Sequence, residues 1–197
     1  NRRNHRDVSP TKMERAKKFI TDLIQSRKGD QIGLIFFAGS AYLQMPLTSD
    51  YAAAEMFAKT ANSNMAGTQG TAIGEAIDLA MRSVKEVNQR ALIIISDGED
   101  HDEDALNLAA KAKDADWTLL TVAVGTEEGG MVPSVVDGQE TYKTDEDGNP
   151  VRSIVNQKLL EQIADEGNGK FYVLNMDENK KSLMTCKSSW RKSKNAQ

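Results

Sequence analysis

Four short, almost uninterrupted apolar runs, at 32–37, 91–95, 118–124 and 171–174, constrain the fold of this chain more than any other feature. None alternates apolar with polar residues, so each predicts a strand that is buried on both faces of a sheet. Helical periodicity separates the runs, and strands that alternate with helices form parallel sheets with right-handed crossovers. The sequence therefore predicts an α/β fold. We expect a mostly parallel central sheet with helices on both faces, and residues 41–45 as an antiparallel edge strand.

The first helix has the clearest start signal. Ser9-Pro10-Thr11 opens it, and Thr11 stands three residues before Glu14 as a capping-box pair. Apolar residues then recur at helical spacing until the helix ends near Gly29. Further helices are expected over 48–61, from about Thr71 onward, and over about 103–114 and 154–166.

The length and the charge of the chain limit the functions that it can have. The chain has 197 residues, which is the size of one domain with modest appendages. Nine of its 25 cations lie in residues 1–6 and 180–197, where there is no acid, so residues 7–179 carry 16 cations against 29 acids, a net charge of −13. Such an acidic body repels phosphate backbones, and we therefore expect no nucleic-acid partner. No apolar run is long enough to span a bilayer, so we expect a soluble chain whose membrane anchor, if it has one, lies outside it.

Catalytic motifs are missing from the sequence. It contains one cysteine, Cys186, which excludes an internal disulfide and a thiolate metal cage. It has no dinucleotide fingerprint after a strand, no phosphate-binding loop that ends in lysine, and no nucleophile elbow. The two histidines, His5 and His101, lie in a basic segment and in an acidic loop. We therefore predict that the chain is not an enzyme, and keep an α/β enzyme that binds a nucleotide or small molecule as the alternative.

Two loops carry the candidate site. In an open α/β sheet, ligands bind outside the carboxyl ends of the strands. One loop, residues 67–74, is rich in glycine and places Thr71 at a helix start, where it is either an N-cap or a ligand. The other begins at Ser96-Asp97-Gly98, directly after an apolar run, and the acids that follow at 99–104 suit the first turn of a helix. A hydroxyl and a carboxylate together favour a hard divalent ion such as Mg²⁺.

The segment 126–153 interrupts the alternation of strands and helices. Asp147-Gly148, between Tyr142 and Val151, is a favoured two-residue turn and predicts a β-hairpin insertion. The acids at 145–147 are similar to the start of a calcium loop, but the glutamate that closes a twelve-residue EF-hand loop is missing.

Residues 70–74, Gly-Thr-Ala-Ile-Gly, and residues 93–98, Ile-Ile-Ile-Ser-Asp-Gly, resemble the second and third loops of a von Willebrand factor A (VWA) domain with a metal-ion-dependent adhesion site (MIDAS). Residues 7–17, 27–37 and 47–51 extend the resemblance to the bacterial BatA/BatB (Bacteroides aerotolerance) group, over about residues 7–178. The resemblance implies a Rossmann-like VWA fold, attachment to the bacterial inner membrane through flanking helices, and operon neighbours that include a MoxR-type AAA+ ATPase. It also implies a protein partner whose carboxylate completes the shell of a bridging Mg²⁺, with Mn²⁺ or Ca²⁺ as substitutes, and a related VWA protein as a further partner.

One departure from the family concerns the first metal loop, Asp-x-Ser-x-Ser, which follows a central first strand. This chain has residues 1–6, Asn-Arg-Arg-Asn-His-Arg, in that place, and they cannot form a buried strand. Residues 7–11 spell Asp-x-Ser-x-Thr, but they already start the first helix. The resemblance therefore implies only Thr71 and Asp97 as metal ligands. If the first strand is missing, we expect an unfilled slot in the middle of the sheet, or a sheet completed by another chain, together with weak metal binding. A metal-independent structural module is a further alternative.

The two ends differ from the family in composition. Residues 1–6 are a basic segment that does not look native, and residues 179–197 form a basic tail where the resemblance fades. Codons exist for 184–197 that, shifted by one nucleotide, encode a charged amphipathic helix, so we hypothesise that this end is out of frame. A disordered basic tail is the alternative. In either case we expect Cys186 and Trp190 to have no function.

Overall fold

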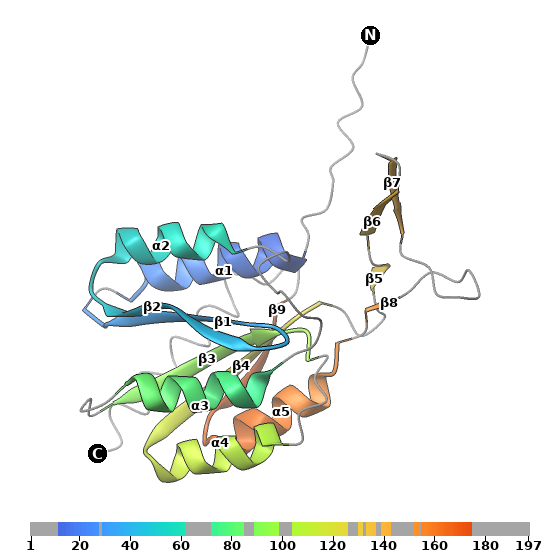
Figure 1. Cartoon of the computed structure of the whole chain (residues 1–197). Coiled ribbons are helices and arrows are strands. Elements are labelled where there is room, and N and C mark those ends of the chain that lie inside the picture. The colour runs from blue at the N-terminus through green and yellow to red at the C-terminus, as the bar shows by residue number, and fades with distance from the viewer. Residues whose placement is uncertain are drawn as a thin grey trace.

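The computed structural model describes residues 12–27, 29–61, 72–84, 89–98, 104–125, 130–131, 133–136, 139–142, 152–153 and 155–174. The predictions made for residues 1–6 and 179–197 lie outside these residues. The larger elements alternate as the sequence predicts (Figure 1). In chain order they are α1 (Lys12–Gln25), β1 (Ile32–Phe37), β2 (Ala41–Thr48), α2 (Tyr51–Thr60), α3 (Ile73–Ser83), β3 (Arg90–Ser96), α4 (Asp104–Asp114), β4 (Trp117–Val124), α5 (Gln157–Glu166) and β9 (Lys170–Leu174).

The central strands form a parallel sheet in the order β3-β4-β9. Ile94 of β3 lies opposite Thr121 of β4, and Val122 of β4 lies opposite Tyr172 of β9. β4 is the middle strand, and seven of its eight residues are buried. This confirms the prediction of a mostly parallel sheet whose strands are covered on both faces.

β1 and β2 form a separate antiparallel pair. The predicted edge strand is confirmed, although it runs to Thr48 and so includes Pro46. Proline is tolerated there because an edge strand does not need every N–H group for pairing. Within the described residues no strand pairs with the other edge of β1 or with the outer edge of β3. A cavity of about 570 Å³ lies between these two edges, lined by residues of α1, β1, α3 and β3. The described residues therefore place no strand between these two edges.

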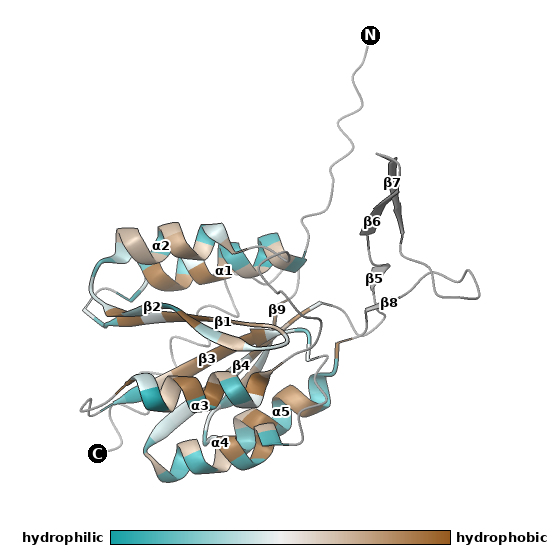
Figure 2. Cartoon of the chain, in the orientation of Figure 1, coloured by the Kyte–Doolittle hydropathy of each residue, from teal (hydrophilic) through white to brown (hydrophobic). Residues whose placement is uncertain are grey.

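Helices cover both faces of the sheets. α1 and α2 lie on one face, and α3, α4 and α5 lie on the other (Figure 1). On the first face Phe19 packs against Val122 and Val124, while on the second Ile77 and Leu160 belong to the largest core cluster. Apolar residues gather on the strands and on the helix faces that meet them (Figure 2). Among the described residues, no helix combines the length and the apolar character that a membrane span requires.

A buried hydrogen bond links β4 to α5. Thr121, a polar residue with no exposed surface, donates its hydroxyl to the backbone oxygen of Leu160 at 2.7 Å. Burying a hydroxyl is costly unless it finds a partner, and this bond satisfies it. It therefore fixes α5 against the middle strand.

Helix boundaries depend on local caps. Asp50 caps α2 by accepting from the N–H of Ala53, so this helix starts at Tyr51 and not near residue 48. α3 starts at Ile73 with Ala72 in the N-cap position and no side-chain cap. The interpretation of Thr71 as the N-cap is therefore wrong, and Thr71 itself lies outside the described residues.

The segment 126–153 contains antiparallel strand pairs. β6 (Pro133–Val136) pairs with β7 (Gln139–Tyr142), and β5 (Gly130–Met131) pairs with β8 (Arg152–Ser153). Antiparallel pairing therefore occurs within the insertion, where Tyr142 pairs with Pro133 and two residues, 137 and 138, join the strands. These two residues are again Asp-Gly, the same turn dipeptide that occurs at 147–148. Residues 147 and 148 lie outside the described part.

Candidate functional site

The candidate site lies at the carboxyl end of β3. Ser96 is the last residue of this strand, and Asp97 follows it directly. The side chain of Asp97 is 31% exposed, so its carboxylate reaches solvent from a position beside the core. This is the edge at which open α/β sheets bind ligands, as the sequence predicts.

The backbone after Asp97 is fixed by the start of α5. The N–H of Asn156, the residue that caps α5, donates to the backbone oxygen of Asp97 at 3.0 Å. Gly98 has a φ of +72°, and a Cβ atom there would lie 2.5 Å from the backbone oxygen of Asn156. Its N–H donates to the hydroxyl oxygen of Ser96 at 3.0 Å. Only glycine fits this turn easily, and the turn holds the Asp97 carboxylate in place.

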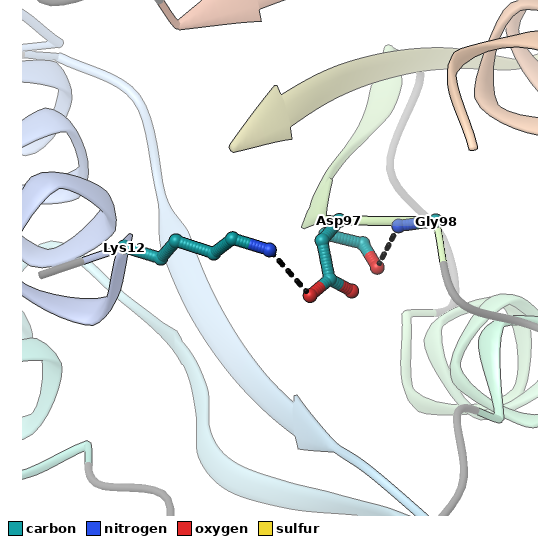
Figure 3. A network of polar contacts seen from close by, with 4 residues as sticks. Lys12, Asp97 and Gly98 are labelled. Carbon is teal, nitrogen blue, oxygen red and sulfur yellow. Dashed lines mark hydrogen bonds and ion pairs between the residues drawn. The ribbon is translucent and has the colours of Figure 1, made fainter. Parts of the chain in front are cut away.

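Lys12 supplies a cation to this carboxylate. Its Nζ lies 3.3 Å from Oδ2 of Asp97 and forms a hydrogen-bonded ion pair with it. Figure 3 shows the Lys12 side chain extending from α1 toward Asp97. A Cβ atom on Gly125, which follows β4, would lie 3.0 Å from Cε of Lys12, so the lysine stem passes close to the end of that strand.

The sequence analysis missed Lys12. The periodicity of the first helix marks it only as one of the polar residues between apolar positions. A signal was nevertheless available. A helix that crosses back over a parallel sheet brings its N-terminal end to the carboxyl ends of the strands, so a lysine in its first turn lies close to an aspartate there.

The predicted ligands are only partly brought together in the described residues. Asp97 is in place, whereas the pairing of Thr71 with it stays a prediction. The first turn of α3, which begins two residues after Thr71, lies beside the start of β2, because Glu75 accepts from the N–H of Ala41 at 2.9 Å. Within the described ranges no three His, Cys, Asp or Glu residues are grouped closely enough to hold a metal ion.

The groups present at Asp97 nevertheless suit a hard cation. They are a carboxylate and the hydroxyl of Ser96, which are oxygen donors of the kind that Mg²⁺ binds. The Lys12 ammonium already places a positive charge beside the carboxylate. The chemistry of the site therefore fits a divalent ion, although the described residues supply only one acidic ligand.

Comparison with known proteins places the chain in a family. The von Willebrand factor type A domain matches residues 6–185. BatB from Bacteroides thetaiotaomicron is 34% identical, with a TM-score of 0.83 over 94% of this chain and 91% of that one. An aerotolerance-related membrane protein from Bacteroides fragilis is also 34% identical, with a TM-score of 0.84 over the same shares of 94% and 91%.

Two more distant similarities complete the comparison. An uncharacterised protein of Borreliella burgdorferi is 25% identical over 178 residues, which are 86% of this chain and 49% of that protein. The chain thus spans about half the length of this relative. Proximal thread matrix protein 1 of the mussel byssus, solved with a zinc-occupied MIDAS motif, shares the fold at 17% identity, with a TM-score of 0.61 over 87% of this chain and 39% of that one.

The alternation of strands and helices, the turn at Asp97 and Gly98, and these similarities agree with one another. The chain belongs to the von Willebrand factor type A domain family and, within it, to the group that includes BatB.

Proposed function

We propose that this domain is a non-enzymatic binding module that holds a protein partner through a Mg²⁺ ion at Asp97, with Thr71 as a second ligand. The observation that carries the proposal is the fixed carboxylate of Asp97, 31% exposed at the carboxyl end of β3 and already paired with a cation. When bound, the ion supplies a positive charge to which a carboxylate of the partner can bind. Mn²⁺ or Ca²⁺ can replace Mg²⁺, because all three take oxygen ligands.

The charge of the domain supports a cation at this place. Residues 7–179 carry a net charge of −13, which raises the local concentration of cations and disfavours a bare partner carboxylate. A divalent ion removes this conflict, because it attracts both Asp97 and the acidic group of the partner. A mussel protein with this fold holds zinc in its MIDAS motif.

We expect the site to be weak in this chain. The described residues supply one carboxylate, and the sequence has no Asp-x-Ser-x-Ser loop after a strand. A charge pair near a protein surface is worth on the order of several kcal/mol. A loss of binding free energy of two or three times about 1.4 kcal/mol lowers the affinity for the metal ion roughly a hundredfold or more. A version that carries such a strand and loop should therefore bind metal at least about a hundredfold more tightly.

The partners follow from the similarity to BatB and the aerotolerance-related membrane protein. We propose that the domain works in a membrane-anchored bacterial complex with a role in aerotolerance or stress. A related VWA protein and a MoxR-type AAA+ ATPase are the candidate partners. VWA domains generally mediate protein interactions, which supports binding as the function over catalysis by a nucleotide-dependent enzyme.

A Mn²⁺ titration, followed by water-proton relaxation, tests the proposal. We expect weak saturable binding that Asp97→Ala abolishes and Thr71→Ala weakens. Asp22→Ala is the matched control, because Asp22 is also an ion-paired carboxylate, 3.2 Å from Lys18, but lies on α1. Equal binding by the wild type and Asp97→Ala would refute the assignment of the site.

A thermal-shift panel with Mg²⁺, Mn²⁺, Ca²⁺, ATP and NAD separates the alternatives. Selective stabilisation by ATP or NAD would favour the enzyme and contradict our proposal. Indifference to every compound, at concentrations up to ten millimolar, would favour a metal-independent structural module.

A further inference from the structure

The insertion of residues 126–153 leaves the fold at the same edge as the candidate site. It begins directly after Gly125, which follows β4, and it ends shortly before Val155, a core residue that is 5% exposed. A Cβ atom on Gly125 would lie 2.5 Å from Cγ2 of Val155, so the two ends of the insertion lie side by side. The next residue, Asn156, donates its N–H to the backbone oxygen of Asp97. The insertion therefore projects from the edge at which an open α/β sheet binds ligands.

The outer hairpin of the insertion, β6 with β7, has neither a third strand nor a covering helix in the described part of the chain. Each of the two strands pairs only with the other, and no described helix or strand of the body makes extensive contact with them. Figure 1 shows the hairpin standing apart from the body of the domain. A two-stranded hairpin is at best marginally stable in water, and a third strand or a helix packed against it supplies the missing stability. The hairpin therefore gains stability when another strand pairs with it.

The register of the hairpin determines which backbone groups face outward. In a hairpin with a two-residue turn, the pair that flanks the turn exchanges two hydrogen bonds, and such pairs alternate along the strands with pairs that exchange none. The flanking pair here is Val136 with Gln139. The backbone groups that face the two outer edges therefore belong to Pro133 and Val135 on β6, and to Glu140 and Tyr142 on β7.

The two outer edges differ in the hydrogen bonds that they offer. Proline has no backbone N–H, so the outer edge of β6 presents only the N–H of Val135, and Pro133 interrupts any ladder on that side. β7 contains no proline, and its outer edge presents the N–H and C=O groups of both Glu140 and Tyr142. The outer edge of β7 is therefore the one that can accept a further strand.

The charge of the insertion indicates which kind of strand suits this edge. Residues 126–153 contain seven acids and two bases, a net charge of −5, and five of these acids lie within residues 137–147, in and around β7. A strand from a second copy of the insertion would bring more negative charge to this edge, and like charges destabilise such a pairing. A strand rich in lysine or arginine would instead be attracted to it.

We propose that the outer edge of β7 is a binding site for an extended, basic segment of a partner polypeptide. The segment adds a third strand to the hairpin by pairing with the N–H and C=O groups of Glu140 and Tyr142. Its lysine or arginine residues lie in the negative field of the insertion, which favours association. This contact goes beyond the proposed cation site, because it requires neither a metal ion nor Asp97.

Binding of a synthetic peptide tests the proposal. The probe is a fluorescein-labelled peptide of seven alternating lysine and valine residues, titrated with the full chain in the presence of EDTA and followed by fluorescence anisotropy. We expect saturable one-to-one binding. Hydrogen exchange, resolved to single amides by NMR, should slow at Glu140 and Tyr142 when the peptide is bound. It should stay unchanged at Val135, which faces the opposite edge of the hairpin.

Two control peptides separate strand pairing from attraction between charges. N-methylation of two consecutive central residues keeps every charge but removes one N–H from each edge of the peptide, so the affinity should fall at least tenfold. A peptide with glutamate in place of each lysine keeps the ability to form a strand but reverses the charge. Its binding should be abolished, because the insertion repels it.

A matched pair of proline substitutions tests the edge in the protein. Tyr142→Pro removes an N–H that faces outward, so β6 and β7 keep the hydrogen bonds between them, and the affinity for the lysine–valine peptide should fall about tenfold. Val135→Pro removes the outward N–H of the opposite edge in the same way and should leave this affinity unchanged. Asp97→Ala should bind the peptide as the wild type does, so a failure of the proposed cation site is distinguished from a failure of this one.

Several results would overturn the proposal. Absence of binding by the folded chain, equal binding of the N-methylated peptide, or equal affinities of Tyr142→Pro and Val135→Pro would show that no strand pairs with β7. Binding only by a chain shortened to end at residue 178 would assign the edge to the basic residues 179–197 of this chain. A dimer in which the amides of Glu140 and Tyr142 are already protected would assign the edge to a second copy.

Discussion

Replacing Lys12 with methionine should increase the affinity of the domain for divalent cations. Lys12 holds its ammonium 3.3 Å from Oδ2 of Asp97, the carboxylate that we assign to the cation. An incoming ion must either displace the ammonium or tolerate its repulsion. Methionine keeps an unbranched apolar stem beside Gly125 but removes the charge, so both costs disappear.

Two limits bound the size of this effect. If the lysine side chain moves away freely, cation binding costs only the free energy of a partly exposed ion pair. This is up to about 1 kcal/mol, or about fivefold in affinity. If the ammonium stays within about 4 Å, two unit charges repel by about 1 kcal/mol even in water, and a divalent ion doubles this to about 2 kcal/mol. The second limit corresponds to about thirtyfold. We therefore expect Lys12→Met to lower the dissociation constant for Mn²⁺ by about fivefold to thirtyfold.

The assay is a Mn²⁺ titration of the wild type, Lys12→Met and Lys18→Met at one ionic strength. Lys18→Met is the matched control, because Lys18 forms an ion pair of 3.2 Å with Asp22 on the same helix. The gain in Mn²⁺ affinity of Lys12→Met over the wild type should also be smaller at high salt, because salt screens partly exposed charges. An unchanged or weaker affinity of Lys12→Met, with the control unchanged, would refute the reasoning that Lys12 competes with the cation.

Three further substitutions test the fold around the site, and each is measured by chemical denaturation. Gly98→Ala should destabilise the domain by about 1–3 kcal/mol, because its positive φ and the close backbone of the α5 cap leave no room for a methyl group; a change below about 0.5 kcal/mol would contradict the described turn. Thr121→Val should cost about 1 kcal/mol through the lost hydrogen bond to Leu160, while Thr121→Ser retains that bond and should leave the α5 amides protected. Ile94→Ala should cost about 2–5 kcal/mol, and Ile93→Ala distinctly less, because Ile93 is only half-buried whereas Ile94 is 2% exposed; equal losses would show that both side chains are equally buried in solution.

Prediction from the sequence worked best for strands covered on both faces, because such strands must be apolar along their whole length. The apolar runs at 32–37 and 91–95 contain no polar alternation, and both form strands at those positions. Asp97 could be placed for the same reason, because a residue that directly follows a buried parallel strand must lie at the ligand-binding edge of the sheet. The similarity in sequence to the BatB group also predicts a central strand beside β3, and the described residues place no strand there.

What sequence reasoning missed depends on contacts between distant residues. Lys12 and Asp97 are 85 positions apart, and periodicity along one helix cannot show which strand end its first turn reaches. The turn dipeptide Asp-Gly also occurs at 137–138, and the pairing of Tyr142 with Pro133, which local composition does not show, makes those residues the connection between β6 and β7. The start of α3 after Thr71 was also missed, since Ala72 offers no capping side chain from which it could be predicted.

The division of the sheet has a consequence for the way in which the domain unfolds. β1, β2 and α2 have a small core of their own, in which Met45, Ala54 and Ala58 pack with Ile24 of α1. No backbone ladder connects this unit to β3, β4 and β9 within the described residues, so packing on α1 and α3 and hydrogen bonds such as that from Ala41 to Glu75 couple them. Cooperativity between two such units is weaker than across a continuous sheet. For these described residues we therefore expect the outer unit to open at a lower free energy than the inner one, which would leave Asp97 and its turn intact.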